Sequence, residues 1–361
     1  MTQKLNKTRQ MLVDSYIESL KEERIPWVQD WENTSAPRNA VTNNEYNGAN
    51  RLLLTYISYE NGYKDPRWCT FNQIMNAEKY HPKEKWHLKK NSKGVPIEYW
   101  YIYDKMNRKS YSISEFEKLK KEDPHIGNFC VLTGRTYYVF NAKDIEGISP
   151  LEIQKFSDIE KNKFMENMIN NMGVGFEEYG DEAFYSLNKD KVTVPLKEHF
   201  KDSYGYHSTV LHELSHASGH PSRLNRDMSG SFGSIDYAKE ELRAEIGSSF
   251  VMQELNIPYD QQHIQNHKAY IQSWIKVLKK DKNELFKAIN DASKIADYLK
   301  EKGNINKEID RTVITEHTEK ENIAPGNDKN ENIAQRIKNA KTKALTQGKN
   351  TENRSKDTPQ R

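Results

Sequence analysis

The stretch HELSHASGH, residues 212–220, places three histidines at intervals of four residues and a glutamate directly after the first of them. On an α-helix, residues four apart lie about 40° apart around the axis and about 6 Å along it, so His212 and His216 can direct their imidazoles to one point. The opposite side of such a helix carries apolar residues: Val210, Leu214 and Ala217. The stretch therefore predicts a helix over about 203–219 with a buried apolar back and a ligand on its other side.

Two imidazoles with this spacing and an adjacent carboxylate form the HExxH pattern, in which the histidines bind zinc and the glutamate is a general base. Glu213 lies about 60° further around the helix than His216, so it can reach a metal-bound water without being a ligand. The competing interpretation is ordinary surface histidines on an amphipathic helix. With 11 histidines in 361 residues, however, the pattern arises by chance in only about two chains per hundred.

A third metal ligand must come from another segment. His220 lies two turns, roughly 12 Å, along the axis from His212, and Gly219 and Pro221 indicate that the helix ends there. As a residue of a bent-back chain, His220 stays open as a ligand or as an oxyanion or substrate contact. Tyr206 is a second candidate for an oxyanion contact.

The segment YAKEELRAEIGSSF offers a carboxylate instead. A long helix with a glutamate, an alanine three residues later and an acid four residues later resembles the ligand helix of gluzincins. That resemblance implies that Glu241 binds the metal and that Glu245 accepts a hydrogen bond from a ligand histidine. Glu240 is the rival ligand. The alternative is a solvated face of acids paired with Lys239 and Arg243.

Two histidines, one carboxylate and an open position suit one zinc ion per chain with a bound water. Zinc lowers the pKa of that water, Glu213 takes its proton, and the resulting hydroxide attacks a carbonyl. We therefore expect a peptidase-like site. The strand KVTVP, just before the catalytic helix, is a candidate for binding an extended peptide by edge pairing.

Bulk properties limit the other classes. The net charge is only +3, so any attraction to nucleic acid must come from local patches. Cys69 and Cys130 stand far apart, which argues against a disulfide scaffold and a thiolate zinc site and suits a reducing cytoplasm. The first 20 residues lack a signal-peptide core, and no run approaches a membrane span. We expect a soluble cytoplasmic protein without membrane contact, with a monomer favoured.

Composition divides the chain at about residues 148 and 302. Residues 1–148 hold five of the six tryptophans; we expect a helix over 8–24 and then short strands such as RWCTF, VPIEYWYIY and RTYYVFNA. Residues 149–302 are expected to be mainly helical, with one hairpin turning at 188–190 and helices over these ranges: 157–171, 203–219, 235–255, 261–279 and 283–302. Residues 303–361 have few large apolar groups and predict a disordered polar tail. The expected fold class is α+β, with a mixed-sheet domain before a zincin-like helical domain that has a small sheet.

Aromatic and basic residues interleave in the first domain, as in surfaces that hold single-stranded DNA. The candidates for DNA contacts are Arg51, Arg67, Trp68, Lys89, Lys90, Lys93, Tyr99 and Tyr101. In EYWYIY, strand alternation predicts an exposed tyrosine face and a core face with Trp100 and Ile102. The alternative is that these aromatics are ordinary sheet core and that KKNSKGVP is a solvated hairpin tip.

Several segments in order resemble antirestriction proteins of the ArdC type. In the second half these are FYSLNKDKVTVP, HELSHASGHPSRLNR, FGSIDYAKEELRAEIGSSF and YIQSWIKVLKKD; in the first half they are IPWVQDW, YNGANRLLL, RWCTFNQI, KKNSKGVPIEYW and YYVFNAKDIEGI. The resemblance covers roughly residues 8–300, but not the charged stretch at about 100–130. It implies a protein of conjugative or other mobile elements, with an N-terminal domain that binds single-stranded DNA and a C-terminal metallopeptidase domain. The implied role is protection of incoming DNA, with host restriction machinery as a candidate protein substrate.

Three other functions remain open. A DNA-binding scaffold with a structural or silent metal site would bind zinc and single-stranded DNA but cleave nothing. A nuclease is disfavoured, because phosphodiester cleavage usually uses carboxylate-rich sites for Mg²⁺. A peptidase whose aromatics are core would show no salt-dependent DNA affinity.

Overall fold

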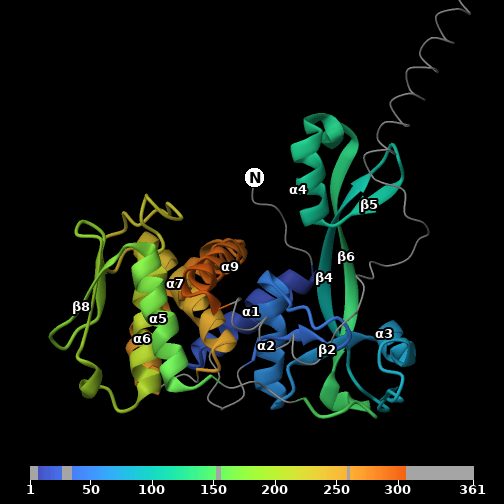
Figure 1. Ribbon diagram of the computed structural model, residues 1–361, viewed down its shortest axis with the longest axis horizontal. Coiled ribbons are helices and arrows are strands. Elements are labelled where there is room, and N and C mark those ends of the chain that lie inside the picture. Colours follow the sequence, from blue (N-terminus) through green and yellow to red (C-terminus); the bar gives the residue numbers. More distant parts are fainter. Residues whose placement is uncertain (1–6, 27–34, 152–155, 258–260, 306–361) are drawn as a thin grey trace, which may run out of the picture. The chain divides into compact units, whose positions relative to one another are not determined.

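The computed structural model describes residues 7–26, 35–151, 156–257 and 261–305 (Figure 1). Most of the expected polar tail, from residue 306 onward, lies outside these ranges. Among the described residues, no helix is long and apolar enough to cross a membrane.

The first half is built on a five-stranded mixed sheet in the order β1-β2-β6-β4-β5. Its strands are β1 Arg38–Asn39, β2 Arg67–Thr70, β4 Val95–Asp104, β5 Lys109–Tyr111 and β6 Cys130–Asn141. Only β1 and β2 run parallel; the other neighbours are antiparallel. A separate pair joins β3 His87–Leu88 to β7 Ile145–Glu146. The expected mixed sheet is confirmed.

Helix α1 (Lys7–Lys21) agrees with the sequence, but the expectation of only short strands between residues 26 and 148 is wrong. Within the described part of that range, residues 35–148, the structure has three more α-helices: α2 Gly48–Asn61, α3 Phe71–Met75 and α4 Ile113–Glu122. Helix α2 ends at Gly62, whose left-handed φ of 62° needs a glycine-like backbone. Capping boxes begin α3 (Thr70 with Gln73) and α4 (Ser112 with Glu115). Short 3₁₀ turns complete the half: Ala77–Lys79, Pro124–Phe129 and Ala142–Asp144.

Strands β4 and β6 form a long ribbon with β5 and α4 at its far end (Figure 1). The expectation that the Trp100 face is core is wrong, because Trp100 is 37% exposed. The tyrosine face is exposed in part: Tyr99 is exposed, whereas Tyr101 is buried. The ribbon runs beyond the core, so both its faces meet solvent. The Trp100 ring instead packs on Gly134, its partner on the neighbouring strand. The contact is so close that a Cβ on Gly134 would lie 3.1 Å from the ring.

The second half matches the sequence expectation closely. Its helices are α5 Asp158–Met172, α6 Ser203–Ala217, α7 Ile235–Glu254, α8 Gln261–Lys280 and α9 Glu284–Gly303, with a 3₁₀ turn at Lys197–His199. Its sheet has the order β8-β10-β9, from β8 Gly175–Glu178, β9 Phe184–Ser186 and β10 Lys191–Val194. The expected hairpin is β9–β10 and turns through Asp190, which has a φ of 46°.

The sheet order corrects the expected peptide-binding strand. KVTVP contains β10, and β10 is paired on both sides, parallel to β8 and antiparallel to β9. A strand that is paired on both sides has no free backbone groups to offer a peptide. The outer edges of this sheet belong to β8 and β9 instead.

One hydrophobic core extends through both halves. Leu12 of α1 and Leu52 of α2 belong to the same buried cluster as Leu214 of α6, Phe250 of α7 and Leu299 of α9. In Figure 1, α5, α6 and α7 run side by side, in agreement with the contacts of α6 with both neighbours. Two smaller clusters lie around the sheet of the first half. The boundary at residue 148 stays a prediction.

Candidate metal centre

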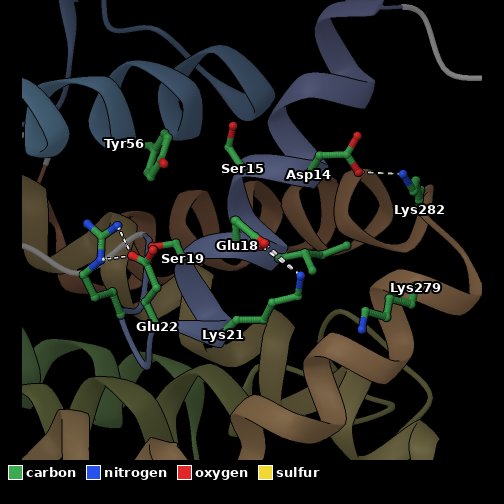
Figure 2. Close-up of a pocket in the computed structure, with 11 residues that line it drawn as sticks. Asp14, Ser15, Glu18, Ser19, Lys21, Glu22, Tyr56, Lys279 and Lys282 are labelled. Carbon is green, nitrogen blue, oxygen red and sulfur yellow. Dashed lines mark hydrogen bonds and ion pairs between the residues drawn. The ribbon is translucent and has the colours of Figure 1, made fainter.

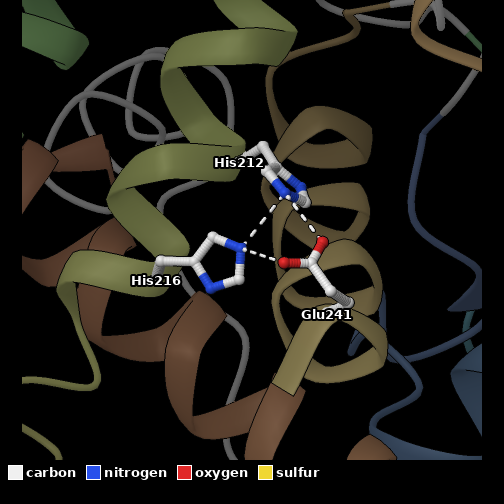
Figure 3. Close-up of side chains that lie close together, drawn as sticks. All are labelled: His212, His216 and Glu241. Carbon is white, nitrogen blue, oxygen red and sulfur yellow. Dashed lines mark hydrogen bonds and ion pairs between the residues drawn. The ribbon is translucent and has the colours of Figure 1, made fainter. Parts of the chain in front are cut away.

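Helices α6 and α7 bring three potential metal ligands together (Figure 3). His212 and His216 come from α6 and Glu241 from α7, and their ligand atoms lie within 4.8 Å of one another. The two Nε2 atoms are 3.2 Å apart, and the Glu241 oxygens lie 3.6 Å from His212 Nε2 and 3.3 Å from His216 Nε2. Two imidazole nitrogens and a carboxylate oxygen facing a common point are a donor set for a divalent cation such as zinc.

Local sequence explains how the two helices present these groups. Asp202 caps the start of α6 by accepting a hydrogen bond from the backbone of Gly205. Ser234 caps α7 in the same way. The buried side of α7 near the site is lined by small residues: Ala238, Ala244 and Ser248. Small side chains let α7 approach α6 closely enough for Glu241 to reach both histidines.

Each ligand histidine has a carboxylate behind it. His212 Nδ1 lies 3.2 Å from Glu245 Oε2, the carboxylate to which the gluzincin resemblance assigns this role. His216 Nδ1 lies 3.4 Å from Glu240 Oε1. Such carboxylates fix the tautomer that leaves Nε2 free for a metal and raise the basicity of the ring. Glu240, considered above as a rival ligand, thus stands behind His216 and not in the triad.

The electrostatics of the centre favour a bound cation. Burial alone would lower the pKa of both histidines, but the surrounding glutamates outweigh it and raise that of His216 to about 9 and that of His212 well above its usual value. Burial would likewise raise the pKa of Glu241, but the two histidines hold it well below the usual range. Glu213, Glu240, Glu241 and Glu245 are all buried around two imidazoles. Positive charge is therefore strongly stabilised at this point.

The triad opens into a cleft of about 740 Å³. Glu213 lines it beside the ligands, where a general base is needed. Its walls come from four places: Asp181, Glu182, Ala183, Phe184, Tyr185 and Leu187 around β9; Thr209 of α6; Met228, Gly230 and Phe232 of the loop before α7; and Tyr237 and Tyr270 of α7 and α8. No lysine or arginine is among the lining residues of the described chain.

Two phenols in this cleft were missed from the sequence. The hydroxyls of Tyr237 and Tyr270 lie 3.3 Å apart. Burial raises the pKa of Tyr237, and the nearby negative charge of Glu241 raises it further. The hydroxyl therefore stays protonated and can donate a hydrogen bond. The available signal was spacing, because Tyr237 precedes Glu241 by four residues and so shares its face of α7.

The expected oxyanion candidates lie elsewhere. Tyr206 donates a 2.6 Å hydrogen bond to Glu178, and neither it nor His220 lines the cleft. His220 follows the end of α6 at Ala217, and its Nδ1 lies 2.7 Å from the Ser222 hydroxyl. His220 is not part of the ligand group, which is formed by the first two histidines of the stretch and Glu241.

Three of the candidate DNA contacts, Arg51, Trp68 and Tyr101, are buried. The Arg51 side chain is inside the molecule and donates to Gln253, Glu254 and the backbone of Phe250. Trp68 has no exposed surface. None of the three is accessible to a DNA strand.

The other basic candidates divide into paired and solvated groups. Arg67 is paired with Asp65 and also donates to the Ser149 carbonyl. Lys89, Lys90 and Lys93 are exposed, although the Lys89 ammonium donates to the Lys143 carbonyl. Lys90 and Lys93 remain candidates for DNA contacts as exposed side chains of a basic surface loop.

An aromatic cluster lies on one face of the β4–β6 ribbon. Tyr99 stacks with Tyr101 at 6.0 Å between ring centroids and meets Tyr137 edge-on at 6.1 Å. The Arg135 guanidinium lies 5.3 Å above the Tyr101 ring. Tyr99 and Tyr137 are 47% and 40% exposed, whereas Tyr101 supports them from below. Tyr137 and Arg135 were missed from the sequence because their position depends on strand register: Arg135 pairs with Tyr99 across the ribbon.

A second cavity, of about 690 Å³, lies along α1 (Figure 2). Its charges neutralise one another: Glu18 pairs with Lys21, and Asp14 pairs with Lys282. The cavity is a solvated groove lined by ion pairs. Unlike the metal centre, its described lining residues do not include a group of His, Cys, Asp or Glu ligand atoms that face a common point.

Two family models match the chain. Residues 6–140 match the N-terminal domain of the anti-restriction factor ArdC, and residues 163–291 match a zincin-like metallopeptidase. A DNA primase TraC of Escherichia coli is 35% identical over 300 residues, which cover 80% of this chain and 27% of that protein. The chain thus spans about a quarter of that primase.

Solved structures of the antirestriction protein ArdC from plasmid R388 have the same fold. The metal-free structure matches with a TM-score of 0.62 and 26% identity, covering 83% of this chain and 99% of that one. The Mn(II)-bound structure matches with a TM-score of 0.61 and 27% identity, covering 83% and 98%. That protein therefore binds a divalent metal within a fold shared by this chain.

Proposed function

From the premise that this chain combines an ArdC-type N-terminal domain with a zincin-like metallopeptidase domain, we propose that it is an antirestriction protein that binds single-stranded DNA and cleaves peptide bonds at a zinc centre. The observation that carries the proposal is the buried triad with Glu213 beside it at the floor of an open cleft. The role we infer is protection of DNA that enters a cell with a mobile element.

The chain's own residues supply the parts of a hydrolytic site. His212, His216 and Glu241 would hold zinc, which supplies a Lewis acid for the scissile carbonyl and lowers the pKa of a nearby water. Glu213 accepts the proton of that water on its carboxylate and returns it to the leaving amine. The Tyr237 hydroxyl lines the same cleft and is a donor that can stabilise developing negative charge on the carbonyl oxygen.

An extended polypeptide is the substrate that best fits the cleft. Strand β9 borders it and is an edge strand, so its outer backbone groups can pair with a peptide. Three large apolar side chains beside it are unusually exposed: Phe184 at 48%, Leu187 at 36% and Phe232 at 82%. Exposed apolar groups that converge on a cleft are typical of a binding surface.

Single-stranded DNA would lie on the aromatic cluster of the β4–β6 ribbon. Tyr99 and Tyr137 offer exposed ring faces for bases, and the exposed Arg135 lies beside them to meet a phosphate. Lys90 and Lys93 stay as candidate backbone contacts. This surface replaces Arg51, Trp68 and Tyr101 as direct DNA contacts; Tyr101 only supports the ring of Tyr99.

Metal content tests the centre. Purified protein is expected to carry one zinc per chain, to lose it in Glu241→Ala and to keep it in His220→Ala. Wild-type protein without zinc, or loss in His220→Ala instead, would refute the ligand assignment.

Activity is tested by incubating zinc-loaded protein with a denatured protein mixture and identifying new termini by mass spectrometry. Glu213→Gln, which keeps all ligands, is the matched inactive control. If antirestriction in cells survives Glu213→Gln, the protein is a DNA-binding scaffold with a silent metal site.

DNA binding is tested with a fluorescent oligo-dT strand. Stacking contributes about 1–3 kcal/mol per base, so Tyr99→Ser should weaken binding by about fivefold or more. Arg135→Gln should also lower the salt dependence of the affinity. Tyr179→Ser is the matched control, because Tyr179 is 74% exposed on the other half of the chain. Equal losses in Tyr99→Ser and Tyr179→Ser would refute this surface.

A further inference from the structure

Beyond the ligands and their adjacent glutamates, an arginine whose side chain is 8% exposed contacts Glu240 behind the centre. Arg226 follows α6 in the turn that leads away from the site. Its Nη2 donates to Glu240 Oε1 at 2.6 Å, and its Nε donates to Glu240 Oε2 at 3.1 Å. The guanidinium therefore holds both oxygens of this carboxylate in a two-pronged arrangement.

The arginine itself is fixed to the end of helix α6. Its Nη1 donates to the Ser218 hydroxyl and its Nη2 to the Ser215 carbonyl, both at 2.8 Å. The backbone of Arg226 also donates to the Gly219 carbonyl, which folds the turn back onto the helix. A Cβ on Gly219 would approach Arg226 Nη2 to 2.9 Å, so a glycine there leaves space for the guanidinium.

We propose that Arg226 is a positioning residue for the metal centre, acting through Glu240 on His216. The chain of contacts runs from the guanidinium to the Glu240 carboxylate and on to His216 Nδ1, leaving Nε2 directed at the ligand point. The two ligand histidines are thus held differently. Behind His216 lies Glu240, whose charge is balanced by Arg226. Behind His212 lies Glu245, which has no exposed surface.

The metal centre concentrates buried negative charge, which makes the pairing of Arg226 with Glu240 important. Glu213, Glu240, Glu241 and Glu245 are buried together, and Arg226 is a cation in direct contact with Glu240. Without the guanidinium, Glu240 would be a buried carboxylate free to turn toward the metal and compete with Glu241 as a ligand. Holding Glu240 by both oxygens keeps it in its place behind His216.

Neighbouring Arg223 provides a matched control. It is equally buried, belongs to the same turn and donates to the Ala217 carbonyl, but its carboxylate partner is Asp190 of the β9–β10 hairpin. Loss of Arg223 should therefore disturb the turn without reaching the ligands.

The test measures zinc affinity by competition with a chromogenic chelator in the full chain. Loss of a group that orients a ligand typically costs 10- to 100-fold in metal affinity, so Arg226→Gln and Glu240→Gln should each weaken binding by about that factor. Because Arg226 acts through Glu240, the double variant should bind no more weakly than Glu240→Gln alone. Arg226→Lys should recover only part of the affinity, and Arg223→Gln should stay within about twofold of wild type.

The visible spectrum of Co²⁺-loaded protein gives a second readout. Arg226→Gln should shift the d–d bands through altered coordination, even if the variant unfolds at a lower temperature. The proposal is overturned if Arg226→Gln keeps wild-type affinity and spectrum, if the two losses add, or if Arg223→Gln loses as much as Arg226→Gln. The proposal rests on the metal centre of the proposed function; wild-type protein that binds no zinc would refute that centre, whereas these other outcomes would refute the role of Arg226 alone.

Discussion

Replacing Arg51 by methionine should destabilise the protein strongly. The Arg51 guanidinium donates to Gln253 Oε1 at 2.9 Å, to Glu254 Oε1 at 2.8 Å and to the Phe250 carbonyl at 2.7 Å, and it lies 4.5 Å above the Phe250 ring. Burial alone would raise the pKa of Glu254, but Arg51, with help from Lys300, holds it at about 2. Methionine fills a similar volume but leaves Lys300, at 3.4 Å, as the cation beside the buried Glu254 charge.

The magnitude follows from that uncompensated charge. Removing one partner of a buried ion pair costs about 3–5 kcal/mol. At about 2–4 °C per kcal/mol for a chain of this size, the melting temperature should fall by about 6–20 °C. Adding Glu254→Gln to Arg51→Met should restore much of this loss, because the remaining side chain is then neutral.

The assay is thermal and urea unfolding of the four members of this double-mutant cycle. Lys21→Met is the surface control: it removes an exposed pair with Glu18 and should not change the melting temperature measurably. Oligo-dT affinity at a temperature where all variants are folded should be unchanged. An Arg51→Met protein with wild-type stability and weakened DNA binding would refute this reasoning and restore Arg51 as a DNA contact.

Three further predictions test other parts of the structure. Burial lowers the pKa of His207 from 6.5 to about 4, so the unfolded chain takes up a proton at this residue at a higher pH than the folded chain does. The free energy of unfolding should therefore be full above about pH 7 and fall by up to about 3 kcal/mol as the pH drops from 6.5 to 4. In His207→Gln, the urea midpoint should depend less on pH within that window. Gly247→Ala, though it favours helix, would bring a Cβ to 2.9 Å from Ile295 Cγ2 and 3.0 Å from its Cβ, and calorimetry should show a loss of about 1–3 kcal/mol instead of a gain. Zinc at about a thousandfold its dissociation constant should stabilise the fold by about 4 kcal/mol, so a chelator should lower the melting temperature of wild type but not that of Glu241→Ala.

The helices of the second half could be predicted because each carries its own local signals. Amphipathic periodicity gave their positions, and a serine or aspartate begins several of them; Ser157 with Glu160 forms a capping box before α5. The HExxH spacing by itself fixed two ligands on one face. Glu241 required the additional pattern of a known ligand helix, because spacing within one segment says nothing about which segment packs against it.

The first half was harder because its helices are short or buried nearly all round. In α2, residues 51–55 are all buried, so the segment has no polar stripe to reveal a period of 3.6. The capping boxes of α3 and α4 were readable as T-x-x-Q and S-x-x-E, and they were overlooked beside strand-forming neighbours. The burial of Arg51 depends on partners about 200 residues away in the chain, which no local pattern records.

Helix α7 connects these observations. Its first half carries Glu240, Glu241 and Glu245 at the metal centre, and its last turns carry the groups that hold Arg51 of the first half. Because a helix is stiff over 20 residues, an anchor at one end restrains the position of ligands at the other. In the N-terminal half, α1 and α2 contribute to the same core as α7 and so support that helix. A fragment that begins at residue 149 should expose this apolar surface and hold metal poorly even though it contains every ligand.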